Sequence, residues 1–221
     1  TICASTTTGF STNFDDSAYL PSCYKVENLD GGANVWKPFS GVTGSGTYAA
    51  GIKYESAAHD DYLFTPPFTV TDGVTDAFSV RVMGWNDYAT ETIDVLLYDP
   101  SNKSLIATLS DDLSTATYQA SGHFTSMLYD LSAYEGQDVM VAFHSSTTDL
   151  FYFFVDNIVV GAYSDMEYGW AGFESSTWSY ADNWYGGSVP TGSITVSANS
   201  DSASNNPSIG SDLSLDDLVV E

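Results

Sequence analysis

The chain has 221 residues, and its 29 Asp and Glu side chains outnumber 5 Lys and Arg, which gives a formal net charge of −24. This charge excludes nucleic acid and anionic membrane surfaces as partners, because binding to phosphate needs clustered Lys and Arg. A hydrophobic content of 43% and an aromatic content of 14% predict a folded chain rather than a disordered acidic one.

Cys3, Cys23 and the lack of long apolar runs indicate the compartment of the protein. No run of about 18 apolar residues is present, so we expect no membrane insertion. No basic segment precedes an apolar one, so we expect that any signal peptide has been removed. The two thiols could remain free, but a disulfide between Cys3 and Cys23 is favoured in an acidic, Lys-poor chain with the character of a secreted protein. We therefore expect an extracellular or cell-surface location.

Short β-type segments follow one another along the chain, with turn residues between them. Helical periodicity is nearly absent: its best window, residues 130–135, is too short and is better interpreted as a turn. Many short strands without helical spacers predict an all-β fold, an antiparallel two-sheet jelly-roll sandwich over about residues 10–162. The expected strands cover residues 46–54, 62–64, 68–70, 77–85, 92–98, 105–108, 123–130, 138–145 and 151–162.

The polarity of three of these strands predicts how they are buried. Residues 77–83 and 92–98 alternate, so one face of each should be apolar and the other polar or mixed, as a two-layer sandwich requires. Residues 151–160 are almost continuously apolar, which predicts a central strand buried on both faces over part of its length.

The composition changes after Ala162, where isolated tryptophans and a low-complexity tract at residues 200–206 appear. Only residues 193–198 and 213–220 resemble strands there, which is too little to bury a core alone. We expect a jelly-roll domain at residues 1–162 and a partial second β-rich module or stalk segment at residues 163–221, in only partial contact with it. Trp178 and Trp184 should pack this module.

Pairs of acids stand beside several short apolar segments. Adjacent carboxylates repel each other, and five cations cannot neutralise them, so a hard cation with oxygen ligands, Ca2+, is the expected partner. The alternative is that these acids are ordinary solvated turn residues. The candidate ligands are Asp15, Asp16, Asp60, Asp61 and Asp156.

Catalytic motifs are missing from the sequence. His59, His123 and His144 stand in no metal-binding pattern, and neither a nucleophile elbow nor a phosphate-binding loop is present, so we expect no enzyme. Trp85, Asp87 and Tyr88 at a strand end could form a ligand-binding platform for a sugar, with Trp36 or Tyr19 as further candidates. The alternative is that the tryptophans fill the core.

Several segments, in order, resemble the cleaved-adhesin or choice-of-anchor J domain, a MAM-like jelly-roll module of Bacteroidetes surface and secreted proteins. Tyr24 stands where this family more often has Trp, and Asn157 stands where a second Asp is usual, which would remove one charge from the acidic cluster. The resemblance also points to calcium. The segments are Asn13-Phe14-Asp15-Asp16, residues 20–24, Asp30-Gly31-Gly32 with Trp36, residues 60–66, residues 130–137, Ala142-Phe143-His144 and Val155-Asp156-Asn157-Ile158.

Residues 177–196 and 213–220 resemble a different Bacteroidetes element, a β-rich repeat or stalk that precedes a sorting signal for type nine secretion. No such signal is present, so we expect a fragment of a longer chain. The two resemblances imply a calcium-stabilised module for adhesion or ligand recognition, whose partners are a glycan or surface protein and further domains of the same polypeptide. The alternatives are an accessory carbohydrate-binding domain of a secreted hydrolase and a purely structural spacer in a filament or stalk.

Overall fold

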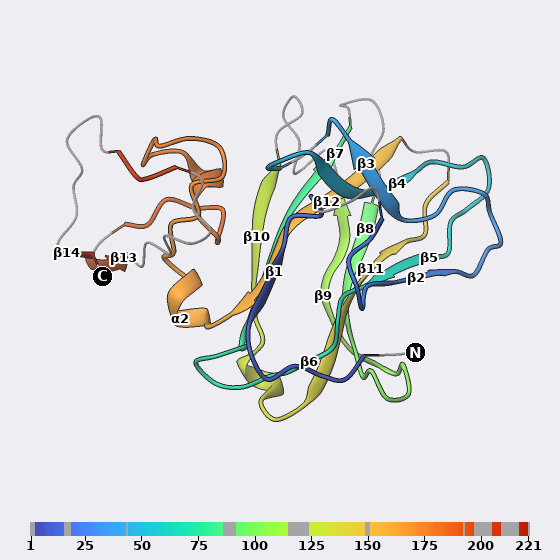
Figure 1. The fold of residues 1–221 in the computed structure, drawn as a ribbon, viewed down its shortest axis with the longest axis horizontal. Coiled ribbons are helices and arrows are strands. Elements are labelled where there is room, and N and C mark those ends of the chain that lie inside the picture. The colour runs from blue at the N-terminus through green and yellow to red at the C-terminus, as the bar shows by residue number, and fades with distance from the viewer. Residues whose placement is uncertain are drawn as a thin grey trace.

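Two antiparallel sheets pack face to face in the computed structural model, which describes residues 3–15, 19–42, 44–85, 92–114, 124–148, 151–191, 193–196, 205–208 and 217–220 (Figure 1). The expected jelly-roll sandwich is confirmed. The first sheet has the order β10 (Thr125–Asp130), β7 (Ala77–Gly84), β12 (Tyr152–Gly161), β4 (Tyr48–Lys53) and β3 (Lys37–Ser40), with β1 (Phe10–Thr12) also on β12. The second has the order β2 (Lys25–Asn28), β5 (Asp61–Phe64), β11 (Asp138–Ser145), β8 (Thr92–Tyr98) and β9 (Leu105–Ser114), with β6 (Phe68–Thr69) on β11.

The core lies between the sheets and takes alternate residues from each strand. On β12, Phe153 and Val155 face this core, so Tyr152 and Phe154 face outward. β12 lies in the middle of its sheet and is buried on both faces over most of its length, as its apolar sequence predicts. A bulge after Asp156 places Asn157 at a φ of 47°, a left-handed conformation that Asn tolerates better than most residues.

Three strands were not expected from the sequence. β1, β2 and β3 contain three or four residues each, without a continuous alternation of apolar and polar residues. They are therefore strands because of the strands that they pair with, rather than because of their own sequence. β3 contains Pro38 and forms an edge of the first sheet, where a missing N–H is tolerated. β9 extends to Ser114, past the expected end at Thr108. The turn expected near residues 130–135 contains a short 3-10 helix, η1 (Ser132–Tyr134).

The segment after Ala162 covers part of the outer face of the first sheet (Figure 1). It contains α2 (Tyr163–Met166) and η2 (Ala181–Asn183), and Met166 and Tyr185 pack on Ala77 of β7. This cover buries Ala77 and Ser79 on the outer face of β7, all of whose residues are buried, and the Ser79 hydroxyl donates to the Tyr185 carbonyl at 3.5 Å. The polar face predicted for residues 77–83 exists, but the C-terminal segment rather than solvent faces it.

Arg81 of β7 anchors the C-terminal segment to the first sheet. Its guanidinium is fully buried, donates to the carbonyl oxygens of Gly44 at 2.6 Å and Phe124 at 2.8 Å, and pairs with Glu174 of the C-terminal segment. The ring of Phe173 lies 4.8 Å from it. A buried charge needs such partners, because an unpaired one costs several kcal/mol.

Three tryptophans pack together in the C-terminal segment, as expected for Trp178 and Trp184. Trp170, Trp178 and Trp184 are nearly fully buried, with ring centroids 4.7–6.3 Å apart. Beyond them, β13 (Ser193–Val196) and β14 (Asp217–Val220) form a parallel pair. The domain boundary at Ala162 remains a prediction. In the described part of the chain, no helix is long and apolar enough to cross a membrane.

Candidate functional site

An aromatic groove lies on the outer face of the first sheet, on the half that the C-terminal segment leaves open. β12 supplies Tyr152 and Phe154, β3 supplies Phe39, and Trp85 follows the end of β7. The groove has a volume of about 320 Å³ and is lined by Phe39, Ser40, Val42, Trp85, Phe151, Tyr152 and Phe154.

The rings in this groove hold one another in place. Tyr152 and Phe154 stack with centroids 5.9 Å apart, and Phe39 meets both edge-on at 5.7 and 5.6 Å. Trp85 lies 6.1 Å from Tyr152 and remains 46% exposed. Lys37 places its ammonium 5.3 Å from the Phe39 ring centroid. The result is a rigid apolar floor with a cation near its edge.

Of the residues expected to bind a ligand, Trp85 is thus on the surface and in a groove. Asp87 and Tyr88 lie outside the described residues. Trp36 is fully buried against Phe143 and fills the core, which is the alternative foreseen for the tryptophans, whereas Tyr19 is 80% exposed.

Two of the acids expected to bind metal hold the loop before β4 through hydrogen bonds. Asp15 accepts the backbone N–H groups of Thr47 and Tyr48, the latter at 2.9 Å. Asp156 accepts those of Gly44 at 2.7 Å and Ser45 at 3.2 Å. Burial raises the pKa of Asp156 to about 7, although these hydrogen bonds oppose the rise. Asp16 lies outside the described residues.

The adjacent acids Asp60 and Asp61 have different surroundings. The Asp60 carboxylate is about half exposed and lies 3.0 Å from Nε2 of His144, which stacks on Tyr62 at 4.1 Å. Asp61 is fully buried and lies 2.7 Å from Nδ1 of His59. Successive residues of a strand face opposite sides of the sheet, which explains the divergence.

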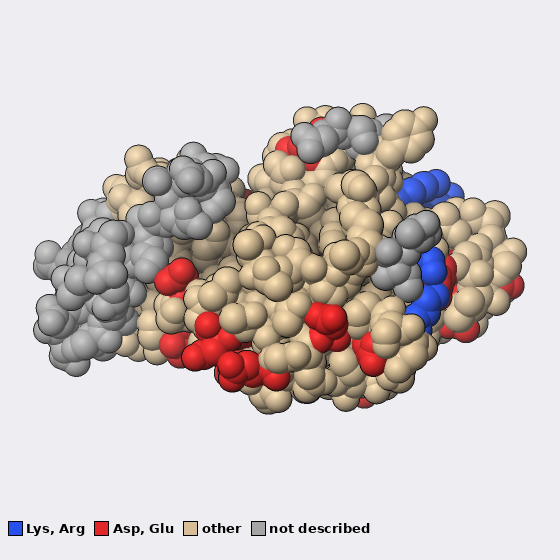
Figure 2. Space-filling view, turned by 60° about the horizontal axis from the view of Figure 1, so that its bottom comes forward, with Lys and Arg blue, Asp and Glu red and all other residues tan. Residues whose placement is uncertain are grey.

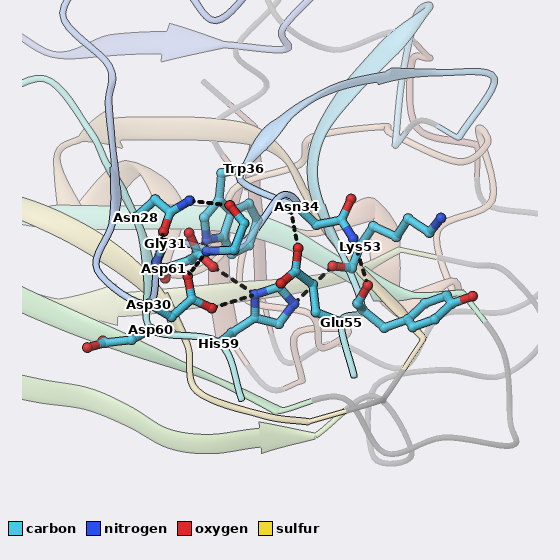
Figure 3. A network of polar contacts seen from close by, with 12 residues as sticks. Asn28, Asp30, Gly31, Asn34, Trp36, Lys53, Glu55, His59, Asp60 and Asp61 are labelled. Atoms are coloured by element: carbon cyan, nitrogen blue, oxygen red, sulfur yellow. Dashed lines mark hydrogen bonds and ion pairs between the residues drawn. The ribbon is translucent and has the colours of Figure 1, made fainter. Parts of the chain in front are cut away.

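Asp30 and His59 join Asp61 in a polar cluster between a loop and β5 (Figure 3). A tight turn, with Gly31 at a φ of 74°, brings the Asp30 carboxylate to within 4.0 Å of His59 Nδ1. In Figure 3 the Asp60 side chain points away from this cluster. Potential ligand atoms of the three residues all lie within 4.8 Å of one another.

His59 contacts both a carbonyl oxygen and a carboxylate. Its Nε2 lies 3.0 Å from the carbonyl oxygen of Lys53, and its Nδ1 lies 2.7 Å from a carboxylate oxygen of Asp61. The second carboxylate oxygen of Asp61, Oδ1, is buried and has no hydrogen-bond partner. An orphaned oxygen of this kind needs a donor or a cation.

The structure therefore joins Asp61 to Asp30 and His59, and it gives Asp15, Asp60 and Asp156 other partners. Sequence reasoning missed Asp30 and His59 as candidates. The signals were the Asp-Gly-Gly turn and the His that precedes the acidic pair. A second acidic group in the described residues, Asp94 with Asp111 and Asp112, is largely exposed.

Comparison with known proteins supports the fold. No known family matches the sequence, and no curated protein matches it. The K1 cleaved adhesin domain of Lys-gingipain from Porphyromonas gingivalis W83 is 21% identical, with a TM-score of 0.57 over 70% of this chain and 98% of that domain. The K3 cleaved adhesin domain of the same protein is 21% identical, with a TM-score of 0.54 over 70% of this chain and 99% of that domain. The K2 domain is 16% identical, with a TM-score of 0.51 over 69% of this chain and 97% of that domain. The resemblance to cleaved-adhesin domains is thus confirmed at the level of the fold.

Proposed function

We propose that this protein is an extracellular, non-catalytic module for ligand recognition, and that its ligand is a glycan bound at the aromatic groove. The observation that carries the proposal is the 46% exposure of Trp85 beside the stacked rings of Tyr152 and Phe154. A large, exposed aromatic side chain that is fixed by its neighbours is typical of a binding surface.

The groove suits the two faces of a sugar ring. Its aromatic floor can pack against the apolar C–H face, while Ser40 and Lys37 at or near its edge can hydrogen-bond hydroxyl groups. A volume of about 320 Å³ is at the lower end of the range for small-molecule sites. The groove therefore suits one or two sugar units.

The fold comparison is compatible with this role, because the similar solved domains are described as adhesin domains. An accessory carbohydrate-binding domain of a hydrolase would use the same groove, and the domains that flank this one would distinguish it from an adhesin. A structural spacer would not need the groove at all.

A glycan array followed by calorimetric titration of the best ligand tests the proposal. Trp85→Ala should weaken binding at least about tenfold, because the ring forms much of the floor. Tyr168→Ala is the matched control, since Tyr168 is a 39% exposed aromatic residue in the C-terminal segment. If no glycan binds, or if both variants bind as the native protein does, the groove is not the site.

We further propose that Ca2+ binds between Asp30 and Asp61. The unpartnered Oδ1 of Asp61 and the nearby carboxylate of Asp30 fit the oxygen ligands that calcium prefers, and calcium completes its shell of six to eight ligands with carbonyls and water. When bound, the ion would fasten the loop that carries Asp30 to the start of β5. Its role would be structural.

A further inference from the structure

The chain has five cations, and two of them meet on the outer face of the second sheet. Nζ of Lys25 lies 2.5 Å from Oε1 of Glu27, and Nζ of Lys103 pairs with the same oxygen. Burial alone would raise the pKa of Glu27, but the hydrogen bonds from Lys103 and Lys25 lower it, so Glu27 is ionised at neutral pH. Two ammonium groups against one carboxylate leave a local excess of one positive charge.

This excess is unusual on so acidic a molecule. On the face drawn in Figure 2, the visible Lys and Arg side chains of the described residues lie toward one end, with acidic side chains beside them and along the rest of the face. A formal charge of −24 repels anions from most of the surface, so an anionic ligand would be admitted only where cations are concentrated.

A pocket of about 310 Å³ opens beside the two lysines. Its apolar wall comes from Phe64, Met140, Pro67 and the Cys3–Cys23 disulfide, and its polar rim from Lys25, Lys103 and Ser22. The side chains of Lys25 and Lys103 are 47% and 34% exposed, and both pair with the same carboxylate oxygen of Glu27. Each ammonium has three N–H donors, so both keep donors for a ligand.

The apolar wall continues along the sheet. Phe64 stacks on Tyr62 with centroids 5.6 Å apart, and Tyr98 meets Phe64 edge-on at 5.6 Å. A bare anion such as acetate would leave most of the pocket of about 310 Å³ empty. A ligand that has both a carboxylate and an apolar ring face fits the pocket better.

We propose that this pocket binds an acidic sugar, a hexuronic acid unit of a glycan, with its carboxylate on Lys25 and Lys103 and its ring in the space that Phe64, Pro67 and Met140 line. The site lies on the opposite sheet from the Trp85 groove and does not depend on that groove being functional. A polymer with both neutral and acidic units could therefore contact the module at two places.

Calorimetric titration of the native protein with glucuronic acid, glucose and acetate at low ionic strength tests the ligand. Glucuronic acid should bind, with an affinity that falls as salt is added, because the contact includes exposed charges. Glucose, without the carboxylate, and acetate, without the ring, should bind at least about tenfold more weakly. Equal binding of glucose or of acetate, or no binding of glucuronic acid, overturns the proposal.

Three lysine variants locate the site. Lys25→Gln and Lys103→Gln should each weaken glucuronic acid binding about five- to tenfold. Lys53→Gln changes the net charge equally but lies on β4 of the other sheet, so it should leave the affinity unchanged. If all three variants weaken binding equally, the effect is one of overall charge and no site exists.

Glu27→Gln should have the opposite effect on the affinity for glucuronic acid. It frees both ammonium groups from their internal carboxylate, so glucuronic acid should bind several-fold more tightly than to the native protein. Weaker binding by a Glu27→Gln variant that melts at the native temperature overturns the proposal. The Trp85→Ala variant should retain glucuronic acid binding, which separates failure of this site from failure of the groove.

Discussion

Removing calcium should lower the melting temperature of this protein by about 5–10 °C. A ligand that binds only the folded state stabilises it by RT ln(1 + [L]/Kd), which is about 2.7 kcal/mol when calcium is a hundredfold above its Kd. For a chain of this size, each kcal/mol moves the melting temperature by about 2–4 °C. The origin of the effect is the buried Oδ1 of Asp61, which has no partner within the protein.

The assay is thermal unfolding with excess calcium and then with a chelator, in metal-stripped buffer. Asp30→Asn and Asp61→Asn should remove most of the calcium response. Asp60→Asn is the matched control, because its carboxylate contacts His144 and points away from the cluster. Magnesium should replace calcium poorly, since it needs a tighter octahedral shell.

Asp156→Asn distinguishes this site from the one expected from sequence alone, in which Asp156 shares the ion. A melting temperature indifferent to the chelator would refute the reasoning altogether. If Asp156→Asn abolished the effect of calcium on the melting temperature and Asp30→Asn retained it, the ion would instead be bound at the loop that Asp15 and Asp156 hold.

Three further predictions concern stability. The double variant Cys3→Ser, Cys23→Ser should have a free energy of unfolding about 3 kcal/mol lower in a denaturant titration, because the disulfide closes a loop across a sequence separation of 20 residues. An unchanged free energy of unfolding would mean that the disulfide does not constrain the unfolded chain. A chain that ends at Ala162 should fold cooperatively but melt at a lower temperature than one that ends at Thr191, since it loses Glu174 and the cover over Arg81; failure to fold would show that the boundary lies elsewhere. The raised pKa of Asp156 means that the folded state holds this proton more tightly than the unfolded state, so its contribution to stability should fall as pH rises from about 4 to 7. A rise from the ordinary 3.8 to about 7 corresponds to on the order of 4 kcal/mol, and unfolding at pH 5 and pH 8 should show a smaller difference for Asp156→Asn than for the native chain.

Local sequence patterns were sufficient to predict most strands of the sandwich, because the alternation of apolar and polar residues and the turn residues are properties of short segments. It failed for β1, β2 and β3, which have little pattern of their own and form by pairing with β12, β5 and β4. It also failed for the outer face of β7, since no local signal shows that a segment about a hundred residues later covers Ser79 and Arg81.

The candidate metal site was predictable in part. That Asp60 and Asp61 face apart follows from the two-residue period of a strand, so their side chains could have been separated from the sequence alone. That Asp30 approaches Asp61 could not, because it depends on the path of the loop after β2. The partners of Asp156 are still more distant in sequence, at Gly44 and Ser45.

The Cys3–Cys23 disulfide has a mechanical consequence. Residues 4–22 lie inside the loop that it closes, and they include Thr6, which pairs with Phe68 of the second sheet, and β1, which pairs with β12 of the first. A pulling force that enters at Cys3 passes through the covalent bond to Cys23 and then into β2, and β1 carries no tension. The segment from Thr6 to the end of β1, which pairs with both sheets, is therefore shielded from shear for as long as the bond is oxidised.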